Sequence, residues 1–277
     1  MGIFDFLRGK KAGNGAGAGQ DQADGDHITR HCFVLCKDAQ APDPGRASRI
    51  VARVFGPGYS ALVQDGSIVT VGRGDDAVGM LAHMPAPIPE GEAERYAEGN
   101  VLWPDGEAEV AEHTSHVIVT NICGGEQSAL DSAIEVSRLA LVALELFNGL
   151  GVYWGNGNVC HSRSIFEGFC EDMSEHHVPV AMWLRLQPVA ISEGEIGLYT
   201  LGMQQFGLMD LEVERCRLPL GELVQFVSGV AQYLVQNGPV IKDGDTVGGS
   251  ETERIKVHHR PSLSQPPRPV YKIVLES

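Results

Sequence analysis

Short apolar runs separated by glycine, proline and aspartate recur through most of this chain, and they predict a series of strands. The first strand is predicted over residues 30–36, because an apolar Phe-Val-Leu run lies at its centre. Residues 60–64 and 67–71 flank Asp65-Gly66, a dipeptide that commonly closes a β-hairpin. The remaining strands are predicted over residues 77–83, 115–122, 152–154, 178–186, 195–201, 253–259 and 270–275.

A long helix is predicted over residues 128–148, where apolar residues cover most of the helical circumference. Its charged residues fall on one narrow stripe, formed by Asp131, Glu135, Arg138 and Glu145. This pattern predicts a largely buried helix, with core positions at Leu139, Val142 and Leu146. Shorter helices are predicted over residues 47–55, 90–98, 165–173 and 220–236, of which 90–98 is expected to be exposed.

The irregular alternation of hairpins and helices predicts an α+β fold, in which a mainly antiparallel mixed sheet packs with helices in one compact body. We expect a single domain over residues 28–277, with sub-halves over 28–127 and 128–277 as an alternative division. Residues 1–11 are an apolar and basic tail, and residues 12–26 are a flexible linker of Gly, Ala, Gln and Asp. Because the linker can bury little apolar surface, we expect the tail and linker to be dispensable for folding.

The chain is acidic, with a formal net charge of −15, and this narrows the partners that it can attract. The tail and linker together carry −1, so the body carries −14. Nonspecific binding to nucleic acid depends on Lys and Arg side chains that neutralise phosphates, so a nucleic-acid partner is not expected. An acidic body suits a basic protein partner instead.

We expect no membrane span and no secretory signal. Even the most apolar stretch, residues 128–149, is interrupted by charged side chains. The initial sequence MGIFDFLRGKK places its apolar residues before its basic ones, which is the reverse of a signal peptide. Six cysteines in a chain of 277 residues do not suggest a disulfide framework, so we expect reduced, mostly buried thiols in a cytoplasmic protein.

Several short motifs in the C-terminal part of the chain occur together in one known family. They are Gly202-Met203, Phe206-Gly207-Leu208, Leu211-Glu-Val213, Tyr233-Leu234, Asn237-Gly-Pro239 and Lys242-Asp-Gly-Asp-Thr-Val-Gly248. Over residues 195–275 the chain thereby closely resembles the bacterial family named domain of unknown function 4261. A weaker resemblance over residues 76–190 rests on Met84-Pro-Ala-Pro-Ile-Pro89, Asn100-Val-Leu-Trp-Pro104, His116-Val-Ile-Val-Thr120 and Gly151-Val-Tyr-Trp154. That family has no established activity, so the resemblance implies a lineage and not a function.

The chain contains none of the common motifs for catalysis or cofactor binding, such as a phosphate-binding loop, HExxH, GxSxG or CxxC. His113 and His116 have a spacing that could ligate zinc on a helix, but His116 begins a predicted strand. Cys160 and His161 are neighbours in sequence, whereas a nucleophile and its base meet in space. We therefore predict no catalytic residue, no metal site and no cofactor.

Two polar turns contain the residues that we expect to contact a ligand or a partner. In residues 151–158, Asn and Gly suit a tight turn, while aromatic and amide groups could form a recognition rim. In residues 242–246, aspartates either accept backbone N–H groups or contact an ion or ligand. The candidate contact residues are Trp154, Asn156, Asn158, His161, Asp243 and Asp245.

Two classes of function remain. The first is a noncatalytic protein-interaction protein, such as an accessory or immunity-type partner in a bacterial system, as the missing catalytic motifs and the acidic body indicate. The alternative is a small-ligand sensor or an unrecognised enzyme with a site around His161, Asp243 and Asp245. Convergence of these three residues in one concave pocket would favour the second class.

Overall fold

The computed structural model describes residues 30–122, 127–171, 173–174, 177–248, 253–264 and 266–275. Contacts within the chain divide it into two compact units. The larger unit contains residues 29–187 and 201–206, and the smaller unit contains residues 188–200 and 207–277. The predicted tail and linker, residues 1–26, lie outside the described residues. Whether residues 28–277 fold as a single domain stays a prediction.

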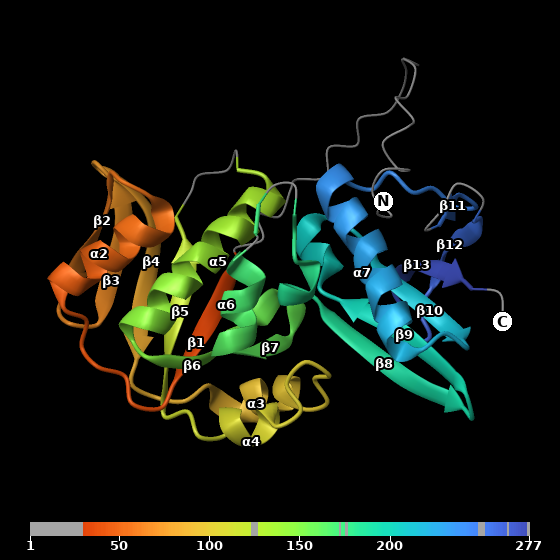
Figure 1. Cartoon of the computed structure of the whole chain (residues 1–277), viewed down its shortest axis with the longest axis horizontal. Coiled ribbons are helices and arrows are strands. Elements are labelled where there is room, and N and C mark those ends of the chain that lie inside the picture. Colours follow the sequence, from red (N-terminus) through yellow and green to blue (C-terminus); the bar gives the residue numbers. More distant parts are fainter. Residues whose placement is uncertain are drawn as a thin grey trace, which may run out of the picture. The chain divides into compact units, whose positions relative to one another are not determined.

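A seven-stranded antiparallel sheet forms the centre of the larger unit (Figure 1). Its strands lie in the order β2-β3-β4-β5-β1-β6-β7. Their bounds are β1 (His31–Cys36), β2 (Tyr59–Gln64), β3 (Ile68–Arg73), β4 (Asp76–Met84), β5 (Ser115–Asn121), β6 (Gly149–Trp154) and β7 (Val159–Ser162). Between β2 and β3, Asp65 and Gly66 have φ angles of 48° and 68°, which confirms the predicted hairpin turn.

Helices cover one face of this sheet. The longest, α5 (Ala129–Leu146), packs against β4, β5, β1 and β6, and it lies in front of β1 and β5 in Figure 1. Beside it, α2 (Pro44–Phe55) packs against β2, and α6 (Arg163–Glu171) against β6 and β7. The Ser128 hydroxyl begins α5 by accepting the Asp131 N–H at 3.0 Å. Buried side chains confirm the predicted core positions Leu139, Val142 and Leu146.

Two short helices, α3 (Glu92–Ala97) and α4 (Gly106–Val110), cover the opposite face of the same sheet. A second apolar core joins Leu35 of β1, Tyr153 of β6 and Cys160 of β7 to residues of these helices. Because both faces are covered, most of β1 is buried. This explains why the β1 sequence is a continuous apolar run and does not alternate between apolar and polar residues.

The smaller unit contains one long helix and strands of a six-stranded mixed sheet, in the order β11-β12-β13-β10-β9-β8. β10 pairs with β13 in parallel, whereas β9 with β10, β11 with β12 and β12 with β13 pair antiparallel. The bounds are β8 (Arg185–Ser192), β9 (Glu195–Leu201), β10 (Asp210–Cys216), α7 (Leu220–Asn237), β11 (Thr246–Val247), β12 (Ile255–Pro261) and β13 (Pro269–Val274). α7 lies in front of this sheet in Figure 1 and buries Leu223, Val227 and Leu234.

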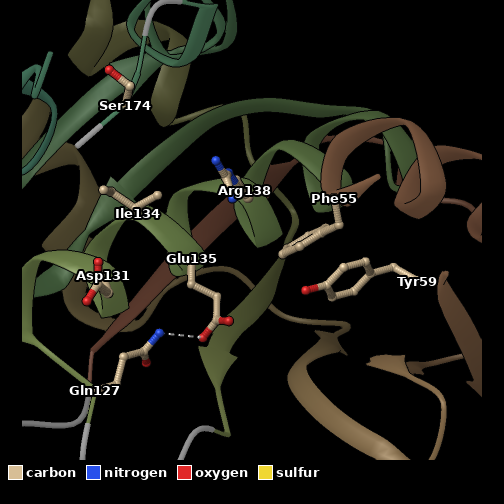
Figure 2. Close-up of a pocket in the computed structure, with 8 residues that line it drawn as sticks. All are labelled: Phe55, Tyr59, Gln127, Asp131, Ile134, Glu135, Arg138 and Ser174. Carbon is tan, nitrogen blue, oxygen red and sulfur yellow. Dashed lines mark hydrogen bonds between the residues drawn. The ribbon is translucent and has the colours of Figure 1, made fainter. Parts of the chain in front are cut away.

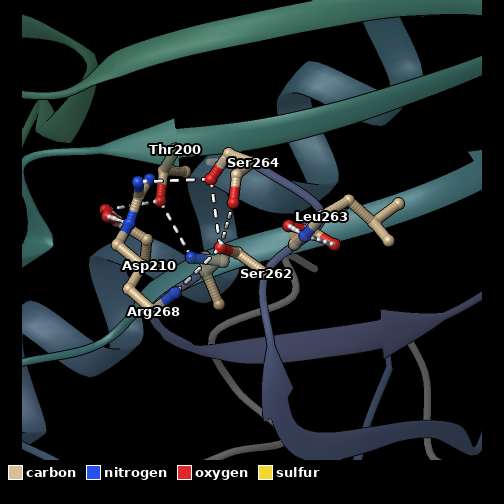
Figure 3. Close-up of polar contacts among 8 residues, drawn as sticks. Thr200, Asp210, Ser262, Leu263, Ser264 and Arg268 are labelled. Atoms are coloured by element: carbon tan, nitrogen blue, oxygen red, sulfur yellow. Dashed lines mark hydrogen bonds and ion pairs between the residues drawn. The ribbon is translucent and has the colours of Figure 1, made fainter. Parts of the chain in front are cut away.

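A network of hydrogen bonds and one ion pair connects the segment between β12 and β13 to the centre of this sheet (Figure 3). The buried carboxylate of Asp210 accepts a hydrogen bond from the Thr200 hydroxyl at 3.1 Å and forms an ion pair with Arg268 at 3.1 Å. The Thr200 hydroxyl in turn accepts the Leu211 N–H at 2.9 Å. An unpaired buried carboxylate would be costly, so these partners are needed where Asp210 lies. The network therefore holds residues 262–268 close to β10.

The predicted fold class, α+β with a mainly antiparallel mixed sheet, is confirmed. The predicted strand over residues 178–186 is wrong: a 3-10 helix, η3 (Val180–Met182), lies there, and β8 begins at Arg185 and continues through Pro188. Proline lacks an N–H, but β8 is the last strand in its sheet order, where a missing donor is tolerated. The strands β7, β10 and β11 were not predicted.

The helix predicted over residues 90–98 is not fully exposed. It is shorter, and Ala93 and Ala97 are buried against the sheet because they lie on one side of α3, four residues apart.

Four cysteines are buried and free, Cys170 is partly exposed, and Cys123 lies outside the described residues. Within the described ranges, no helix combines the length and apolar character that crossing a membrane requires.

Candidate functional site

The loop between α3 and α4, residues 98–105, is held in place by two of its own side chains. The Asn100 amide donates to the Cys160 carbonyl on β7 at 2.5 Å, and its Oδ1 accepts the Leu102 N–H at 2.9 Å. Trp103 is buried in the core beneath α3 and α4. With Asn100 and Trp103 turned inward, the residues between them are turned toward solvent.

Two glycines make room for the Trp103 ring. A Cβ atom on Gly151 of β6 would lie 3.0 Å from this ring and 2.6 Å from the His161 carbonyl oxygen. A Cβ atom on Gly106, at the start of α4, would lie 2.9 Å from the same ring. Protein interiors are too closely packed to accept such approaches without movement. The position of Trp103 therefore depends on glycine at both places.

Arg185 holds the C-terminal end of α3, where the loop begins. Its guanidinium group donates to the carbonyls of Tyr96 at 3.3 Å and Glu98 at 3.1 Å, and lies 5.9 Å from the centroid of the Tyr96 ring. The last carbonyls of a helix lack partners within the helix and carry partial negative charge, so a cation there is stabilising. Arg185 thus restricts the movement of the loop at its start.

Aromatic rings hold α3 to the sheet. Tyr96 stacks on Tyr153 of β6 with ring centroids 5.7 Å apart, and Tyr153 stacks on Phe33 of β1 at 5.6 Å. The Tyr153 hydroxyl donates to the Glu92 carboxylate at 2.8 Å, and burial together with this carboxylate raises the pKa of the phenol. Both the first and the last turn of α3 are therefore held to the rest of the larger unit.

The outer side of residues 90–112, which we call the α3–α4 surface, combines an apolar pair with carboxylates. Val101 and Leu102 are 44% and 43% exposed. The segment contains eight Asp or Glu residues and one Arg. Five exposed carboxylates make no hydrogen bond or ion pair in the described part of the chain: Glu90, Glu98, Asp105, Glu107 and Glu109. Such a surface can bury apolar groups and attract cationic ones.

The candidate residues in the turn after β6 have partners inside the larger unit. Trp154 is buried, and its indole N–H donates to the Gln205 side-chain oxygen at 2.9 Å. Gln205 belongs to η4 (Met203–Phe206), so Trp154 holds that short helix in place. Asn156 accepts the His31 N–H at 3.4 Å, and Asn158 has a φ of 51°. Both asparagines are half-buried, and their role as contact residues stays a prediction.

His161 on β7 is 1% exposed, with its Nε2 3.1 Å from the Ala181 carbonyl. Burial lowers the pKa of the imidazole to about 4, against the opposing effect of that carbonyl, so the ring is neutral near pH 7. Cys160 lies in the core beneath α3, on the other face of the strand, because neighbouring strand residues point to opposite sides. Burial also raises the pKa of the Cys160 thiol. The two side chains therefore form no nucleophile and base pair.

Asp243 and Asp245 lie in a turn of the smaller unit, before β11. Asp245 accepts the Lys242 N–H at 2.8 Å, and Asp243 accepts the His259 N–H at 2.9 Å. The hydrogen bond from His259 lowers the pKa of Asp243, and Arg260, 3.4 Å away, acts in the same direction. These hydrogen bonds from backbone N–H groups match the first of the two roles predicted for the aspartates of this turn. His161 belongs to the other unit, and a common site for the three residues stays a prediction.

His113 and His116 bond to different parts of the backbone. His113 accepts the Ile88 N–H through Nε2 at 2.8 Å and donates from Nδ1 to the Val110 carbonyl at 2.6 Å, which occupies both of its nitrogens. His116 Nδ1 lies 2.8 Å from the Ala86 carbonyl. Among the residues that the structure describes, no three His, Cys, Asp or Glu side chains are placed to hold a metal ion.

A small open pocket of about 200 Å³ lies on the helical side of the larger unit (Figure 2). It is lined by Phe55, Tyr59, Gln127, Asp131, Ile134, Glu135, Arg138 and Ser174. Three of the four residues of the predicted charged stripe on α5 line it, and the fourth, Glu145, pairs with Arg53 of α2. The Gln127 amide donates to Glu135 at 3.3 Å. Its lining mixes two acids with one arginine, and it does not include any of the candidate contact residues predicted above.

Comparison with known proteins finds a family match in the C-terminal part of this α+β chain. Residues 199–274 match the model of the family described as domain of unknown function (DUF4261). This match confirms the suspected family and extends from β9 to the end of β13. No curated protein and no solved structure matches the chain. The α3–α4 surface lies upstream of the matched residues, where the weaker resemblance stays a prediction.

Sequence reasoning did not identify the α3–α4 surface as a site. The motif Asn100-Val-Leu-Trp-Pro104 contributed only to the resemblance, and residues 90–98 were treated as a solvated helix. Two signals were present in the sequence. One is the run of Asp and Glu residues with a single Arg over residues 90–112, and the other is the apolar pair Val101-Leu102 between Asn100 and Trp103. Neither signal shows which side chains point inward, since this depends on Cys160, Gly151 and the other residues that surround the loop.

Proposed function

We propose that this chain is a noncatalytic protein-interaction protein whose α3–α4 surface binds a segment of another protein that is basic and carries apolar side chains. The observation that carries the proposal is the exposure of Val101 and Leu102 on a loop held by Asn100 and Trp103. A loop held in this way presents its apolar groups with little further ordering on binding, and preorganisation of this kind favours affinity.

The charge around the apolar pair supports a basic partner. Exposed carboxylates without partners in the described part of the chain lie on both sides of the pair in sequence, from Glu98 to Glu109. Complementary charge steers association and suppresses wrong partners, whereas burial of the apolar pair supplies affinity. The partner segment should therefore place Lys or Arg around one or two large apolar side chains.

The alternative function, a ligand sensor or enzyme around His161, Asp243 and Asp245, is less well supported. His161 is buried with a neutral ring, and the two aspartates bond to backbone N–H groups. All three side chains therefore already contact polar groups of the chain itself. We therefore place the interaction role first and keep the alternative as a second candidate.

Capture from the native cell with a matched pair of variants tests the proposal. The bait is the full chain, compared with Leu102→Ser on the α3–α4 surface and Leu62→Ser on β2, where the leucine is 59% exposed. We expect at least one cellular protein to bind both the wild-type chain and Leu62→Ser. The same protein should not bind Leu102→Ser. Its binding to the purified chain should weaken with rising salt and with Glu107→Lys/Glu109→Lys.

Two outcomes would contradict the proposal. One is a captured protein whose binding is equally strong to the wild-type chain and Leu102→Ser. The other is binding that Glu107→Lys/Glu109→Lys leaves unchanged at low salt. In either case the α3–α4 surface would not be the site of interaction.

A further inference from the structure

We infer that residues 1–11 of this chain occupy the α3–α4 surface intramolecularly and must be displaced before an external partner binds. The inference rests on the proposed function, because it assigns a ligand of the chain itself to the same surface.

The tail has the chemistry that the surface requires of a partner. Its sequence MGIFDFLRGKK contains four large apolar side chains, Ile3, Phe4, Phe6 and Leu7, followed by Arg8, Lys10 and Lys11. With Asp5, its net charge is +2, whereas residues 90–112 carry −7. Apolar side chains can cover Val101 and Leu102 while the basic residues pair with carboxylates such as Glu107 and Glu109.

The side chains of His31 and Phe33, at the start of β1, point toward the face of the sheet that α3 covers. His31, at the start of β1, contacts Phe33 with ring centroids 5.3 Å apart. Phe33 contacts Tyr153 at 5.6 Å, and Tyr153 contacts Tyr96 of α3 at 5.7 Å. Three successive ring contacts therefore connect the first strand to α3 across one face of the sheet. The point at which residues 1–29 join the described chain therefore lies three ring contacts from α3.

The length and composition of the connecting segment suit this arrangement. Residues 12–29 comprise 18 residues that are rich in Gly, Ala, Gln and Asp. A random coil of 18 residues has a root-mean-square end-to-end distance of roughly 23 Å. A tether of this reach gives an effective concentration on the order of millimolar. Even a weakly binding tail would then occupy the surface for much of the time.

Competition follows from this occupancy. An external partner binds only the fraction of molecules whose surface is free, so its apparent affinity falls by that fraction. A partner with more basic or larger apolar groups displaces the tail, whereas a poorly matched protein does not. The tail thus raises the threshold for binding and improves the discrimination between partners.

Carbodiimide coupling in the full chain tests the inference, because it joins a lysine amine directly to a nearby carboxylate. We expect links from Lys10 or Lys11 to Glu98, Glu107 or Glu109. Their yield should fall several-fold with Val101→Ser/Leu102→Ser, with Phe6→Ser/Leu7→Ser, and at high salt. It should not change with the matched control Leu62→Ser. Mixing chains of two isotopic compositions separates links within one chain from links between two copies.

The contradicting outcomes are specific. Absence of links from Lys10 and Lys11 to residues 90–112, or equal links to acids outside this surface, such as Glu222 of α7, would overturn the inference. Links that join the two isotopic compositions would assign the tail to a second copy and overturn the intramolecular arrangement. If Val101→Ser/Leu102→Ser does not change the yield of these links, the apolar pair is not the binding site.

A second measurement distinguishes this inference from the proposed function. A labelled synthetic peptide of residues 1–11 is added to the full chain that carries Arg8→Glu/Lys10→Glu/Lys11→Glu. The inference expects saturable binding of the peptide and several-fold weaker binding to the unmodified chain, whose own tail competes. Failure of the proposed function leaves these results intact, since no external partner is used. If the peptide does not bind while an external protein still requires Leu102, the inference fails and the proposed function stands.

Discussion

At the scale of single residues, the contacts around Trp103 decide how the α3–α4 surface is presented. The indole ring fills a space that exists because Gly151 and Gly106 have no side chain. The Asn100 amide adds a hydrogen bond to β7 from the same loop. Val101 and Leu102 are exposed as a consequence of these inward contacts, and their own chemistry does not determine their position.

A methyl group at Gly151 should disturb this arrangement. In Gly151→Ala the new Cβ would lie 2.6 Å from the His161 carbonyl oxygen, and a backbone atom moves less easily than a side chain. Overpacking of this kind costs roughly 1–3 kcal/mol, so we expect the free energy of unfolding in urea to fall by that amount. Gly168→Ala in α6 is the control, since nothing lies within 4 Å of its added Cβ. It should raise stability by about 0.5–1 kcal/mol because alanine favours a helix. Equal effects of the two substitutions would contradict this account.

The buried imidazole of His161 should make stability depend on pH. Its pKa is lowered from 6.5 to about 4 by burial, so the unfolded chain binds this proton more readily than the folded chain. The contribution of the neutral ring is complete above the unfolded value and is lost as pH falls toward the folded value. Over this window the loss should reach roughly 3 kcal/mol.

Urea unfolding at a series of pH values checks this prediction with His161→Gln as the comparison. We expect the variant to show a smaller decrease in stability between neutral and acidic pH than the wild-type chain. The pKa values of His83 and His116 are also lowered by burial, and both histidines remain in the variant. A residual slope is therefore expected, and only identical slopes for the two chains would show that His161 does not contribute.

At the scale of elements, polar side chains determine where some segments lie. Asp210, at the start of β10, holds the segment that precedes β13 through its ion pair with Arg268. Arg185, at the start of β8, holds the end of α3. In both cases one charged side chain connects segments that are far apart in the sequence, so the connection is not visible in any local pattern.

Removing the charge of Asp210 should destabilise the protein. In Asp210→Asn the side chain stays buried, and the partly exposed Arg268 guanidinium loses its ion pair. We expect a decrease of roughly 1–3 kcal/mol in the free energy of unfolding. The comparison is Glu112→Gln, which breaks an ion pair with Lys37 in which both side chains are more than half exposed. No measurable change is expected there, because solvent screens such pairs. A larger effect for Glu112→Gln than for Asp210→Asn would reverse this ranking.

The sequence pattern predicted elements well where one signal dominated. α5 has apolar residues around most of its circumference, and its charged stripe indeed borders the solvent. The prediction was poorer for residues 178–186, whose apolar side chains are buried in an irregular segment that includes η3. A short apolar run indicates burial, but it does not distinguish a strand from a buried loop.

At the scale of the whole molecule, the tail should contribute little to folding stability. A chain that begins at His27 lacks the tail and linker but keeps every element that the structure describes. Weak docking of the tail stabilises the folded state only by mass action, so we expect its removal to change the free energy of unfolding by less than about 1.5 kcal/mol.

Thermal and urea unfolding of this truncated chain provide the measurement. Val142→Asp in the full chain is the reference for a severe defect, since it places an unpaired carboxylate at a fully buried position of α5 and should prevent folding. A loss of several kcal/mol on truncation would mean that the tail belongs to the folded core. A soluble and cooperatively folding Val142→Asp chain would mean that α5 is not buried as described.

Properties that depend on local patterns and composition could be predicted from the amino-acid sequence. These are the α+β class, the hairpin at Asp65-Gly66, the buried helix α5, the net acidity and the match of residues 199–274 to the DUF4261 family model. Each follows from side-chain periodicity, turn chemistry, charge or motif, all of which can be seen within a short stretch of sequence.

Tertiary contacts, in contrast, determine which residues face solvent in the α3–α4 surface and which candidate contact residues are buried. Trp154 and His161 looked suitable for contacts from their residue types, yet both are enclosed by segments distant in sequence. Val101 and Leu102 belonged to no predicted site, yet they are exposed on a loop that Asn100 and Trp103 hold in place. The physical reason is that exposure results from packing between distant segments, and no local pattern of the chain specifies that packing.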